Sequence, residues 1–478
     1  MRIDLEQLRN RLPEQRWFGG KGRPLASVEV IDHAILDDGP PSLALGIFRV
    51  NYEDGDSQLY HLPLLVEEDG SSRDALDDVD RLKLLGELMA HGDSVKGERG
   101  VFNFGGPGLD PLSPPGAGSA RVLQAEQSNT SLVLDDSIII KLFRRVDYGS
   151  NPDLELTRFL TNEAFSHIPP HLGEVVYEGD ELQDEPVQID IAIAQRFIPD
   201  AREGWVETLN HLRGLYDAVD PADVAEDLRF LTEERAARSL KWMGELGDVT
   251  ASMHVALARE EADPEFGAEA IDESDLEEWA ERARASLKTL QARRLPEIAA
   301  LDPLAPRIEA GIDRLKGLTE RGSKTRIHGD YHLGQVIRSP RGWMILDFEG
   351  EPVRTLDERV AKQSALRDVA GMLRSLNYAA YAALFERGDP GSDEWARLEP
   401  WARTWEDLAR EKLLSSYLTR SHEGRFLPTE REDLMTMLEV FEIDKALYEL
   451  GYEIGHRPTW IRIPLEGIAK VIERGESS

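Results

Sequence analysis

Residues 328–335 read HGDYHLGQ, and residues 345–349, at the end of a short apolar run, read ILDFE. Gly329 in the first stretch predicts a tight turn, and the apolar run predicts a strand that ends beside Asp347. Asp330 and Gln335 lie in the first stretch, so two carboxylates and one amide follow one another within a short length of chain. Carboxylate and amide oxygens are ligands that suit Mg²⁺. The two stretches are therefore a candidate site for a divalent ion and for proton abstraction.

The spacing between Asp330 and Gln335 equals that between Asp and Asn in the kinase catalytic loop H-R-D-L-x-x-x-N. Phosphoryl transfer needs a carboxylate beside the attacking hydroxyl and oxygen ligands for the metal that bridges the phosphates. In that geometry Asp330 accepts the proton of the hydroxyl, and Gln335 supplies a side-chain carbonyl to Mg²⁺. Asp347, followed by Phe and Glu, takes the place of the metal-binding Asp of D-F-G. The sequence therefore predicts a phosphoryl-transfer site.

The same residues have two alternative interpretations. One is structural, a buried histidine followed by a turn aspartate. The other is a zinc site, because His328 and His332 lie four residues apart, as in H-E-x-x-H. That zinc motif requires a helix to bring both imidazoles to one face. Gly329 and the strand-turn context disfavour a helix here, so the order of the two stretches favours phosphoryl transfer.

A lysine within an apolar strand is the candidate for contacting phosphates. Lys141 lies in IIIKLF, as the kinase lysine lies in V-A-I-K. A lysine in such a run is costly to bury unless it is paired. The segment from Asn151 to Leu160 is predicted to be a helix, and its Glu155 is the expected partner, with Glu163 less favoured. The alternative is a strand-edge lysine that reaches solvent.

The segment before this strand replaces the glycine-rich loop of kinases. The pattern SLVLDD–SIIIKLF predicts a hairpin, and QSNTS stands at its start. Backbone N–H groups and small hydroxyls there are expected to cap phosphates, through Ser128, Asn129 and Thr130. Further along, QRFI follows a predicted buried strand, where kinases join their lobes and hold adenine. Gln195 and Phe197 are therefore also candidate nucleotide contacts.

A helix near the C-terminus is the candidate sugar site. At about 100° per residue, its core stripe consists of Ile443, Leu447, Leu450 and Ile454. The opposite face and its flanks carry Glu442, Lys445, Tyr448, Glu449, Tyr452 and Glu453, and Trp460 follows. Carboxylates accept hydrogen bonds from sugar hydroxyls, and aromatic rings stack on apolar sugar faces. A solvated helix face is the alternative explanation of these charges.

The chain is predicted to be an α+β protein with three parts. Residues 1–90 read as mixed strand and turn and form an N-terminal cap subdomain. Residues 91–200 form a strand-rich, nucleotide-binding lobe, with a linker or surface loop over the Gly-, Pro- and Ser-rich residues 101–120. Residues 201–478 form a mainly helical lobe that carries the catalytic and sugar residues. The expected architecture is bilobal and protein-kinase-like.

Composition limits the partners of this protein. Its 478 residues include 90 acidic and 56 basic ones, a formal charge of −34. Such an acidic surface repels nucleic acid and anionic lipid, because phosphate neutralisation requires clustered Lys and Arg. No apolar run reaches the roughly 20 residues of a membrane span, and no secretory signal is seen. The absence of cysteine excludes disulfides and thiolate metal sites, and the expected location is the cytoplasm.

These segments together resemble the bacterial maltokinases, including the kinase portions fused to trehalose synthases. The resemblance runs along most of the chain, through RWFGGK, QSNTS, NPDLEL, AQRFIPD, RIHGDYHLGQVIRS, ILDFEGEP, KQSALRDVAGMLRSLNYAAY, DKALYELGYE and RPTWIRIPL. It implies an N-terminal cap over a bilobal kinase fold, with ATP and Mg²⁺ as cofactors and a small-molecule sugar as substrate. It gives Asp330, Gln335, Asp347 and Lys141 the roles described above. Residues in the matching segments are also expected to shape the site: His332, Glu349, Arg367 and Asp368.

The resemblance implies that ATP and maltose give maltose 1-phosphate and ADP, feeding α-glucan synthesis, with trehalose synthase as a possible partner. Glucosamine kinases look similar in the catalytic motifs and the cap. The acids Glu442, Glu449 and Glu453 could hold an ammonium as readily as hydroxyls, so an aminosugar or aminoglycoside is the first alternative substrate. A pseudokinase that binds without turnover is the second alternative. The complete set of lysine, base and metal ligands disfavours it.

Overall fold

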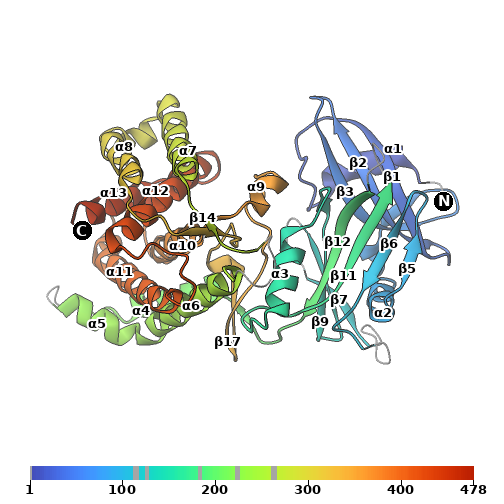
Figure 1. Cartoon of the computed structure of the whole chain (residues 1–478), viewed down its shortest axis with the longest axis horizontal. Helices are drawn as coiled ribbons and strands as arrows, with labels where there is room; N and C mark the ends of the chain where they lie inside the picture. The colour runs from blue at the N-terminus through green and yellow to red at the C-terminus, as the bar shows by residue number, and fades with distance from the viewer. Residues whose placement is uncertain are drawn as a thin grey trace. The chain divides into compact units, whose positions relative to one another are not determined.

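The computed structural model describes residues 3–110, 118–123, 129–180, 186–220, 227–259 and 266–477 (Figure 1). The chain divides into two compact units, Met1–Pro199 and Asp200–Ser478, here called unit 1 and unit 2. Strands make up most of unit 1, and helices make up most of unit 2. Among the helices of the described ranges, none has the length and apolar character to cross a bilayer. The predicted division near residue 90 stays a prediction.

The first sheet of unit 1 is antiparallel and is built on three long strands, β1 (Leu25–Asp37), β2 (Ser42–Tyr52) and β3 (Ser57–Val66). Both of its faces are buried. Leu45 and Ile47 of β2 belong to one apolar cluster, whereas Phe48 and Val50 belong to another. The second cluster includes residues of helix α1 (Leu5–Arg11). Two short strands also pair with β3, namely β4 (Ser72–Asp74) and β10 (Arg145–Val146).

The second sheet of unit 1 has the strand order β5-β6-β11-β12-β9-β8-β7. The predicted hairpin is present as β8–β9, in which Ser131 lies opposite Lys141. The predicted helix is present as α3 (Pro152–Asn162), and the Asn151 side chain caps its N-terminus. The strands of this sheet are β5 (Ser94–Lys96), β6 (Gly100–Gly105), β7 (Ala120–Leu123), β8 (Thr130–Leu134), β9 (Ile138–Leu142), β11 (His171–Asp180) and β12 (Pro186–Arg196), and helix α2 spans Lys83–His91.

One strand of this sheet contradicts the sequence analysis. A linker or surface loop is predicted over residues 101–120, but its first residues form β6, which pairs with both β5 and β11. Phe102 and Phe104 both enter the apolar core, with the two-residue period of a strand. The glycines and prolines that follow obscured this short pattern. Residues 111–117 lie outside the described residues.

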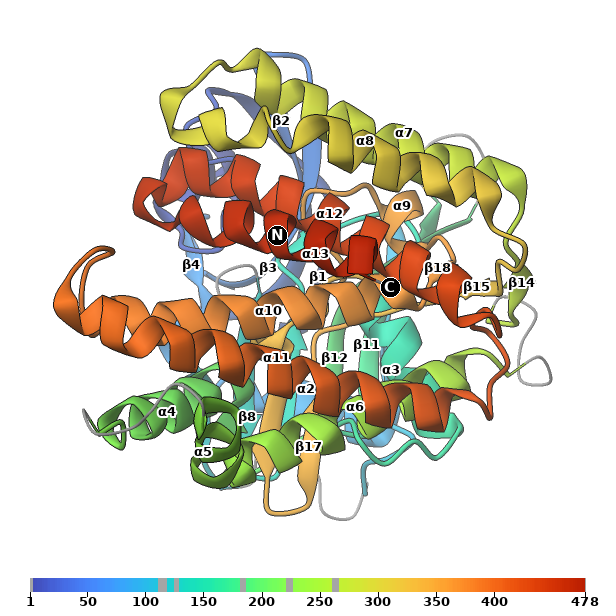
Figure 2. The same cartoon turned by 90° about the vertical axis from the view of Figure 1, so that its left-hand side faces the viewer.

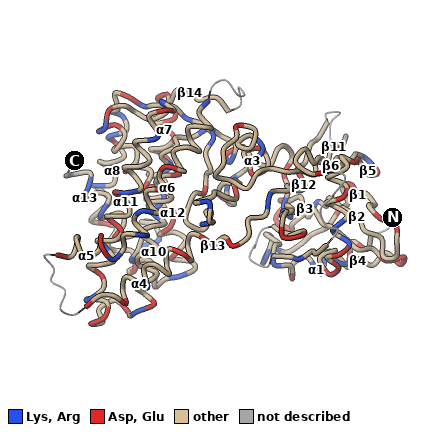
Figure 3. Tube along the Cα trace, turned by 90° about the horizontal axis from the view of Figure 1, so that it is seen from below, with Lys and Arg blue, Asp and Glu red and all other residues tan. Residues whose placement is uncertain are grey.

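Unit 2 is mainly helical, and its longest helices pack side by side. Helix α10 packs against both α11 and α12, and α12 packs against α13 (Figure 2). Acidic and basic residues are interspersed along these helices (Figure 3). The helices are α4 (Gly204–Asp217), α5 (Leu228–Arg235), α6 (Ala237–Leu257), α7 (Glu273–Ala292), α8 (Ala305–Asp313), α9 (Leu356–Val360), α10 (Leu366–Phe385), α11 (Asp393–Ser421), α12 (Arg431–His456) and α13 (Arg462–Ser477).

Two small antiparallel sheets carry the HGD and LDF motifs within this helical unit. In the first, β16 is the central strand between β13 and β17, and in the second, β15 lies between β14 and β18. The HGD motif follows β15, and the LDF motif follows β17. Their bounds are β13 (Arg202–Glu203), β14 (Glu269–Ala270), β15 (Ser323–Thr325), β16 (Val336–Ser339), β17 (Gly342–Ile345) and β18 (Gln363–Ser364).

Candidate active site

The HGD turn is held in place by helix α10. The backbone N–H groups of His328 and Gly329 donate to the two carboxylate oxygens of Asp368, at 2.8 and 2.9 Å. Gly329 has a φ of +83°, which glycine adopts without steric cost. A side chain there would also meet the backbone of Gly350 at 3.1 Å. The turn therefore fixes Asp330, which lines a cavity.

Asp368 is itself held by a chain of buried groups. Its Oδ2 lies 3.0 Å from Nε2 of His254, and Nδ1 of His254 lies 3.0 Å from the hydroxyl of Tyr417. Burial raises the pKa of Asp368, but His254 and the backbone N–H of Gly329 more than offset this, so the pKa lies below its ordinary value. Asp368 therefore holds the turn as a carboxylate.

Gln335 and Asp347 lie at the same end of the β16–β17 hairpin. Gln335 directly precedes β16, and its carbonyl accepts a hydrogen bond from the N–H of Leu346 at 2.9 Å. The carbonyl of Leu346 lies 2.8 Å from Nε2 of His328, which joins this end of the hairpin to the HGD turn. Asp347 has a φ of +58°, so the chain turns directly after the strand. The fold thus brings the predicted base and metal ligands into one region.

His332 lies in the same region. Its Nε2 is 3.8 Å from Oδ2 of Asp330. Desolvation lowers the pKa of His332, and the carboxylates of Asp330 and Asp347 oppose that lowering. Both carboxylates therefore lie near enough to His332 to affect its charge.

The donor set fits magnesium better than zinc. Within the described ranges, no three His, Asp or Glu side chains gather as a metal cluster. Mg²⁺ does not require one, because it keeps several waters and binds through one or two carboxylates together with substrate phosphates. His328 and His332 lie in a turn and a short 3₁₀ cap, and a ring nitrogen of each already contacts the backbone. The zinc interpretation therefore loses its geometric basis.

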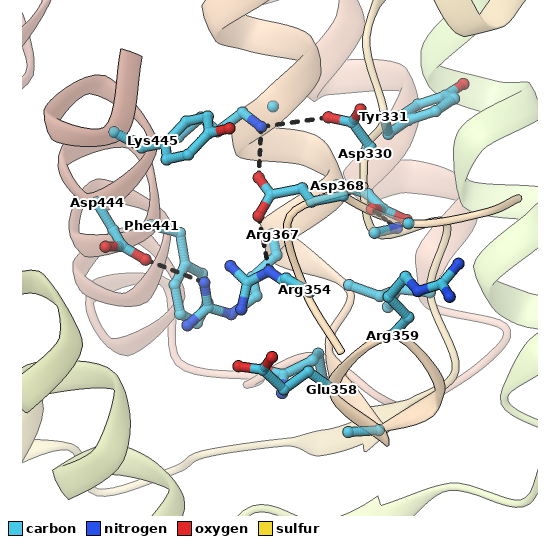
Figure 4. Close-up of a pocket in the computed structure, with 18 of the residues that line it drawn as sticks. Asp330, Tyr331, Arg354, Glu358, Arg359, Arg367, Asp368, Phe441, Asp444 and Lys445 are labelled. Carbon is cyan, nitrogen blue, oxygen red and sulfur yellow. Dashed lines mark hydrogen bonds and ion pairs between the residues drawn. The ribbon is translucent and has the colours of Figure 1, made fainter. Parts of the chain in front are cut away.

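A cavity of about 250 Å³ opens beside Asp330 (Figure 4). The ammonium of Lys445, on α12, lies 3.3 Å from Asp330 and 2.7 Å from Glu351. Arg354 donates to the other oxygen of Glu351 at 2.6 Å. Burial opposes the charge of Lys445, but Glu351 and Asp330 more than offset it and raise the pKa of this lysine. The cavity therefore contains a fixed cation beside the candidate base.

A second ion pair lines the same cavity. Nη1 of Arg367, on α10, lies 3.1 Å from Asp444, on α12, and the guanidinium lies over the ring of Phe441 at 4.5 Å (Figure 4). Desolvation lowers the pKa of Arg367, and Asp444 opposes that effect. Four of the predicted sugar or site-shaping residues line the cavity: Arg367, Asp368, Lys445 and Tyr448.

The three predicted sugar-binding glutamates of α12 lie outside this cavity lining. Each is ion-paired to an arginine. The pairs are Glu442 with Arg410 of α11 at 2.6 Å, Glu449 with Arg374 of α10 at 2.8 Å, and Glu453 with Arg457 at 2.7 Å. The physical reason is that α12 packs against α7, α8, α10 and α13, so its charged face is largely enclosed by other helices. Their predicted sugar contacts are not favoured by this geometry.

The other predicted sugar residues are also outside the lining. Tyr452 is 46 % exposed and stacks on His456, with 4.2 Å between ring centroids. Trp460 stacks on Phe385 at 5.9 Å. The backbone carbonyl of Glu349 accepts a hydrogen bond from Arg359. Their roles in sugar binding stay predictions.

In unit 1, Lys141 is buried and ion-paired. Its ammonium lies 3.0 Å from Oδ2 of Asp153, in the first turn of α3, and both side chains are almost fully buried. The sequence analysis named Glu155, two residues further along this helix, and did not consider Asp153. The alternative of a strand-edge lysine in solvent is wrong, because Lys141 is only 5 % exposed.

The predicted phosphate-capping residues are engaged by Arg144. Thr130 and Asn129 are buried at the start of β8, and their side chains accept hydrogen bonds from Arg144. Ser128 lies outside the described residues. At the end of β12, the Gln195 side chain lies 3.5 Å from the carbonyl of Pro169, and the N–H of Phe197 donates to the carbonyl of Ser137.

Sequence reasoning missed five residues of these sites, namely Asp153, Arg144, Glu351, Arg354 and Asp444. Local signals existed for some of them. Asp153 stands in NPDLEL at a helix N-terminus, and Asp444 directly precedes Lys445. Glu351 follows ILDFE by two residues, but its pairing with Lys445 links positions 94 residues apart. Such a contact is set by tertiary packing and leaves no local pattern.

Two parts of the chain match known protein families. Residues 12–95 match the family described as Maltokinase N-terminal cap domain, and residues 198–401 match the one described as Phosphotransferase enzyme family. The chain is 27 % identical over 356 residues to a glucosamine kinase of Streptacidiphilus jiangxiensis, across 72 % of this chain and 71 % of that protein. It is 26 % identical over 377 residues to a glucosamine kinase of Mycolicibacterium smegmatis, across 75 % and 81 %.

Solved structures share the fold of the whole chain. A glucosamine kinase in complex with glucosamine, ADP and inorganic phosphate matches with a TM-score of 0.70 at 21 % identity, over 98 % of this chain and 100 % of that one. A second crystal form of a glucosamine kinase matches with a TM-score of 0.72 at 22 % identity, over 96 % and 97 %. At this level of identity the likeness establishes the architecture.

Proposed function

Because the chain is a sugar kinase that joins a maltokinase N-terminal cap domain to a catalytic domain of the phosphotransferase enzyme family, we propose that it phosphorylates maltose from ATP. The products are maltose 1-phosphate and ADP. The α+β, kinase-like fold with a sheet-rich cap, predicted from the sequence, is confirmed. A trehalose synthase that supplies maltose is the protein partner that this proposal implies.

Asp330 is the base of the proposed reaction. It accepts the proton of the anomeric hydroxyl as the oxygen–phosphorus bond forms and the bond to ADP breaks. Its place at the cavity wall, fixed by the Asp368 hydrogen bonds to the HGD turn, is the observation that carries the proposal. A positioned base contributes about 10²- to 10⁴-fold to such a step.

Candidate nucleotide residues occur in unit 1 and in unit 2, and each group is described by itself. Gln335 and Asp347 would hold Mg²⁺, which supplies charge neutralisation on the phosphates. Lys141 contacts the phosphates, and its pair with Asp153 gives the ammonium a fixed position. Thr130 begins β8 and Asn129 directly precedes it, and the following residue, Ser131, lies opposite Lys141. This assignment makes ATP and Mg²⁺ the cofactors.

The charges of the cavity favour a neutral sugar. Asp330 and Glu351 contact Lys445, and Asp444 contacts Arg367. Carboxylates that already face fixed cations gain little from a further ammonium, whereas hydroxyls donate to and accept from such paired groups. This arrangement supports a neutral sugar, as maltose is, over an aminosugar as the acceptor.

Glucosamine is the second candidate acceptor, because the two relatives described above are glucosamine kinases. The sequence argument for it was the acidic group Glu442, Glu449 and Glu453. Each of these carboxylates is ion-paired to an arginine, which weakens that argument.

An assay of ADP release with maltose, glucosamine and glucose tests the proposal. We expect the highest kcat/KM with maltose, and a ³¹P NMR signal of an anomeric phosphate in the product. Reactions without sugar measure background ATP hydrolysis. Turnover of glucosamine without turnover of maltose would overturn the assignment and leave the second candidate.

A further inference from the structure

Arg144 is a fully buried arginine that contacts the cap. It follows β9, and its backbone carbonyl accepts a hydrogen bond from the N–H of His61 at 2.9 Å. Nη2 lies 2.9 Å from a carboxylate oxygen of Asp74, and the guanidinium lies 4.9 Å from the ring centroid of Trp17. All three partners belong to residues 12–95, which match the cap family. The cap therefore surrounds one side of this guanidinium.

The other side of Arg144 reaches the start of β8. Nε donates to the hydroxyl oxygen of Thr130 at 2.9 Å, and the backbone N–H lies 3.4 Å from the side-chain oxygen of Asn129. The next residue, Ser131, is the cross-strand neighbour of Lys141. One arginine thus connects the cap to the strand beside the phosphate-contacting lysine.

The geometry makes these contacts depend on one another. A guanidinium is planar and rigid, so its Asp74 and Thr130 hydrogen bonds share one orientation. A buried charge is costly unless it is paired and hydrogen-bonded. In the described part of the chain, Nη1 of Arg144 has no hydrogen-bond partner, so the guanidinium is oriented by its bonds to Asp74 and Thr130 and by the ring of Trp17. Removal of the Asp74 charge would therefore let the guanidinium move, and with it the donor to Thr130.

We propose that the cap sets nucleotide affinity through Arg144, which holds Asn129 and Thr130 in the position that receives the phosphates of ATP. This inference rests on the nucleotide assignment in the proposed function and adds a role for the cap. Arg144 is a positioning residue in this scheme, because it acts through the start of β8.

The Asp74→Asn variant tests the inference. We expect the affinity for ADP, titrated with Mg²⁺ and without sugar, to fall by about fivefold or more, and KM for ATP to rise in proportion. The values of kcat and of KM for the sugar should stay within about twofold. The matched control is Asp77→Asn, an exposed carboxylate in the short helix (Ala75–Asp78) whose N-terminus Asp74 caps, for which no change is expected. A merely structural role for Asp74 would lower the active fraction and leave KM for ATP unchanged.

A double-mutant cycle separates this route from other causes. Thr130→Val removes the acceptor of Arg144 with little change of shape. Because both substitutions act through one guanidinium, their combined effect on ADP affinity should be smaller than the product of the two single effects. Trp17→Phe is the milder variant to use if Asp74→Asn lowers the folded fraction. The inference would be overturned if the folded cap variants bound ADP as tightly as the wild type, or if the Asp74 and Thr130 substitutions had fully independent effects. Neither result would contradict the nucleotide assignment. Failure of the wild-type protein to bind ADP would overturn the nucleotide assignment as well.

Discussion

Lys141 in unit 1 and Lys445 in unit 2 are both ion-paired, but their surroundings differ. Lys141 pairs with Asp153, 12 residues away, where both side chains are nearly inaccessible to solvent. Lys445 contacts Asp330 and Glu351, which lie 115 and 94 residues away, and it lines an open cavity. We therefore expect the Asp153 partner of Lys141 to contribute mainly to stability, and the contacts of Lys445 to contribute mainly to the proposed reaction. This difference can be tested by removing one carboxylate at a time.

The largest effect is expected at the Asp330 partner of Lys445. Asp330→Asn should lower kcat by about 10² or more, because the substitution removes the proposed general base, while the affinity for ADP stays near that of the wild type. Steady-state ADP release and calorimetric titration measure the two quantities. The matched control is Asp357→Asn on α9, an exposed aspartate outside the cavity lining. Wild-type turnover in the Asp330 variant would contradict the assignment of the base.

A large loss of stability is expected at the Asp153 partner of Lys141. Asp153→Asn leaves a buried ammonium beside a neutral amide, and breaking such a pair costs about 3 kcal/mol. The midpoint of urea unfolding, followed by tryptophan fluorescence, measures this loss. Glu155→Gln in the same helix is the matched comparison and should cost less. A greater loss in the Glu155 variant would identify the residue named from the sequence as the main partner.

The smallest expected effect is a pH-dependent loss of folding stability on substitution of Glu351. Burial raises the pKa of Glu351, but Lys445 and Arg354 more than offset this and hold it below the ordinary 4.5. A carboxyl group with a lowered pKa stabilises the folded state above its ordinary pKa, and this contribution is lost as the pH falls through the lowered value. Glu351→Gln should therefore cost about 1.5 kcal/mol at pH 7 and progressively less below pH 4.5.

Urea unfolding of the wild type and the Glu351 variant at several pH values measures this dependence. Asp357→Asn again serves as the control, since its carboxylate is exposed. A difference between wild type and variant that grew as the pH fell would contradict the sign of the effect.

Local patterns predicted the fold where partners are near in sequence. The hairpin β8–β9 and helix α3 follow from apolar alternation and from the Asn-Pro start of NPDLEL. The HGDYHLGQ and ILDFE stretches meet because the β16–β17 hairpin joins them. Strand β6 was missed because its apolar alternation is short. Phe102 and Phe104 point to the core, but a run rich in glycine and proline follows them directly.

The sugar side was less predictable for a reason that α12 illustrates. Helical periodicity groups residues on faces, but it does not say what packs against each face. Because α12 is packed against several helices, the acids Glu442 and Glu449 meet Arg410 and Arg374 from α11 and α10. Those arginines lie far away in sequence, so no pattern within the helix could reveal that the acids were already paired.

The strand β10 has a consequence for engineering of this kinase. It comes soon after Lys141 along the chain, yet it pairs with β3 in the first sheet. In a shortened enzyme without its first 90 residues, β10 would have no β3 to pair with. Arg144 would also lose its contacts with Trp17 and Asp74. Modular exchange between related enzymes should therefore transplant both sheets of unit 1 as a single block.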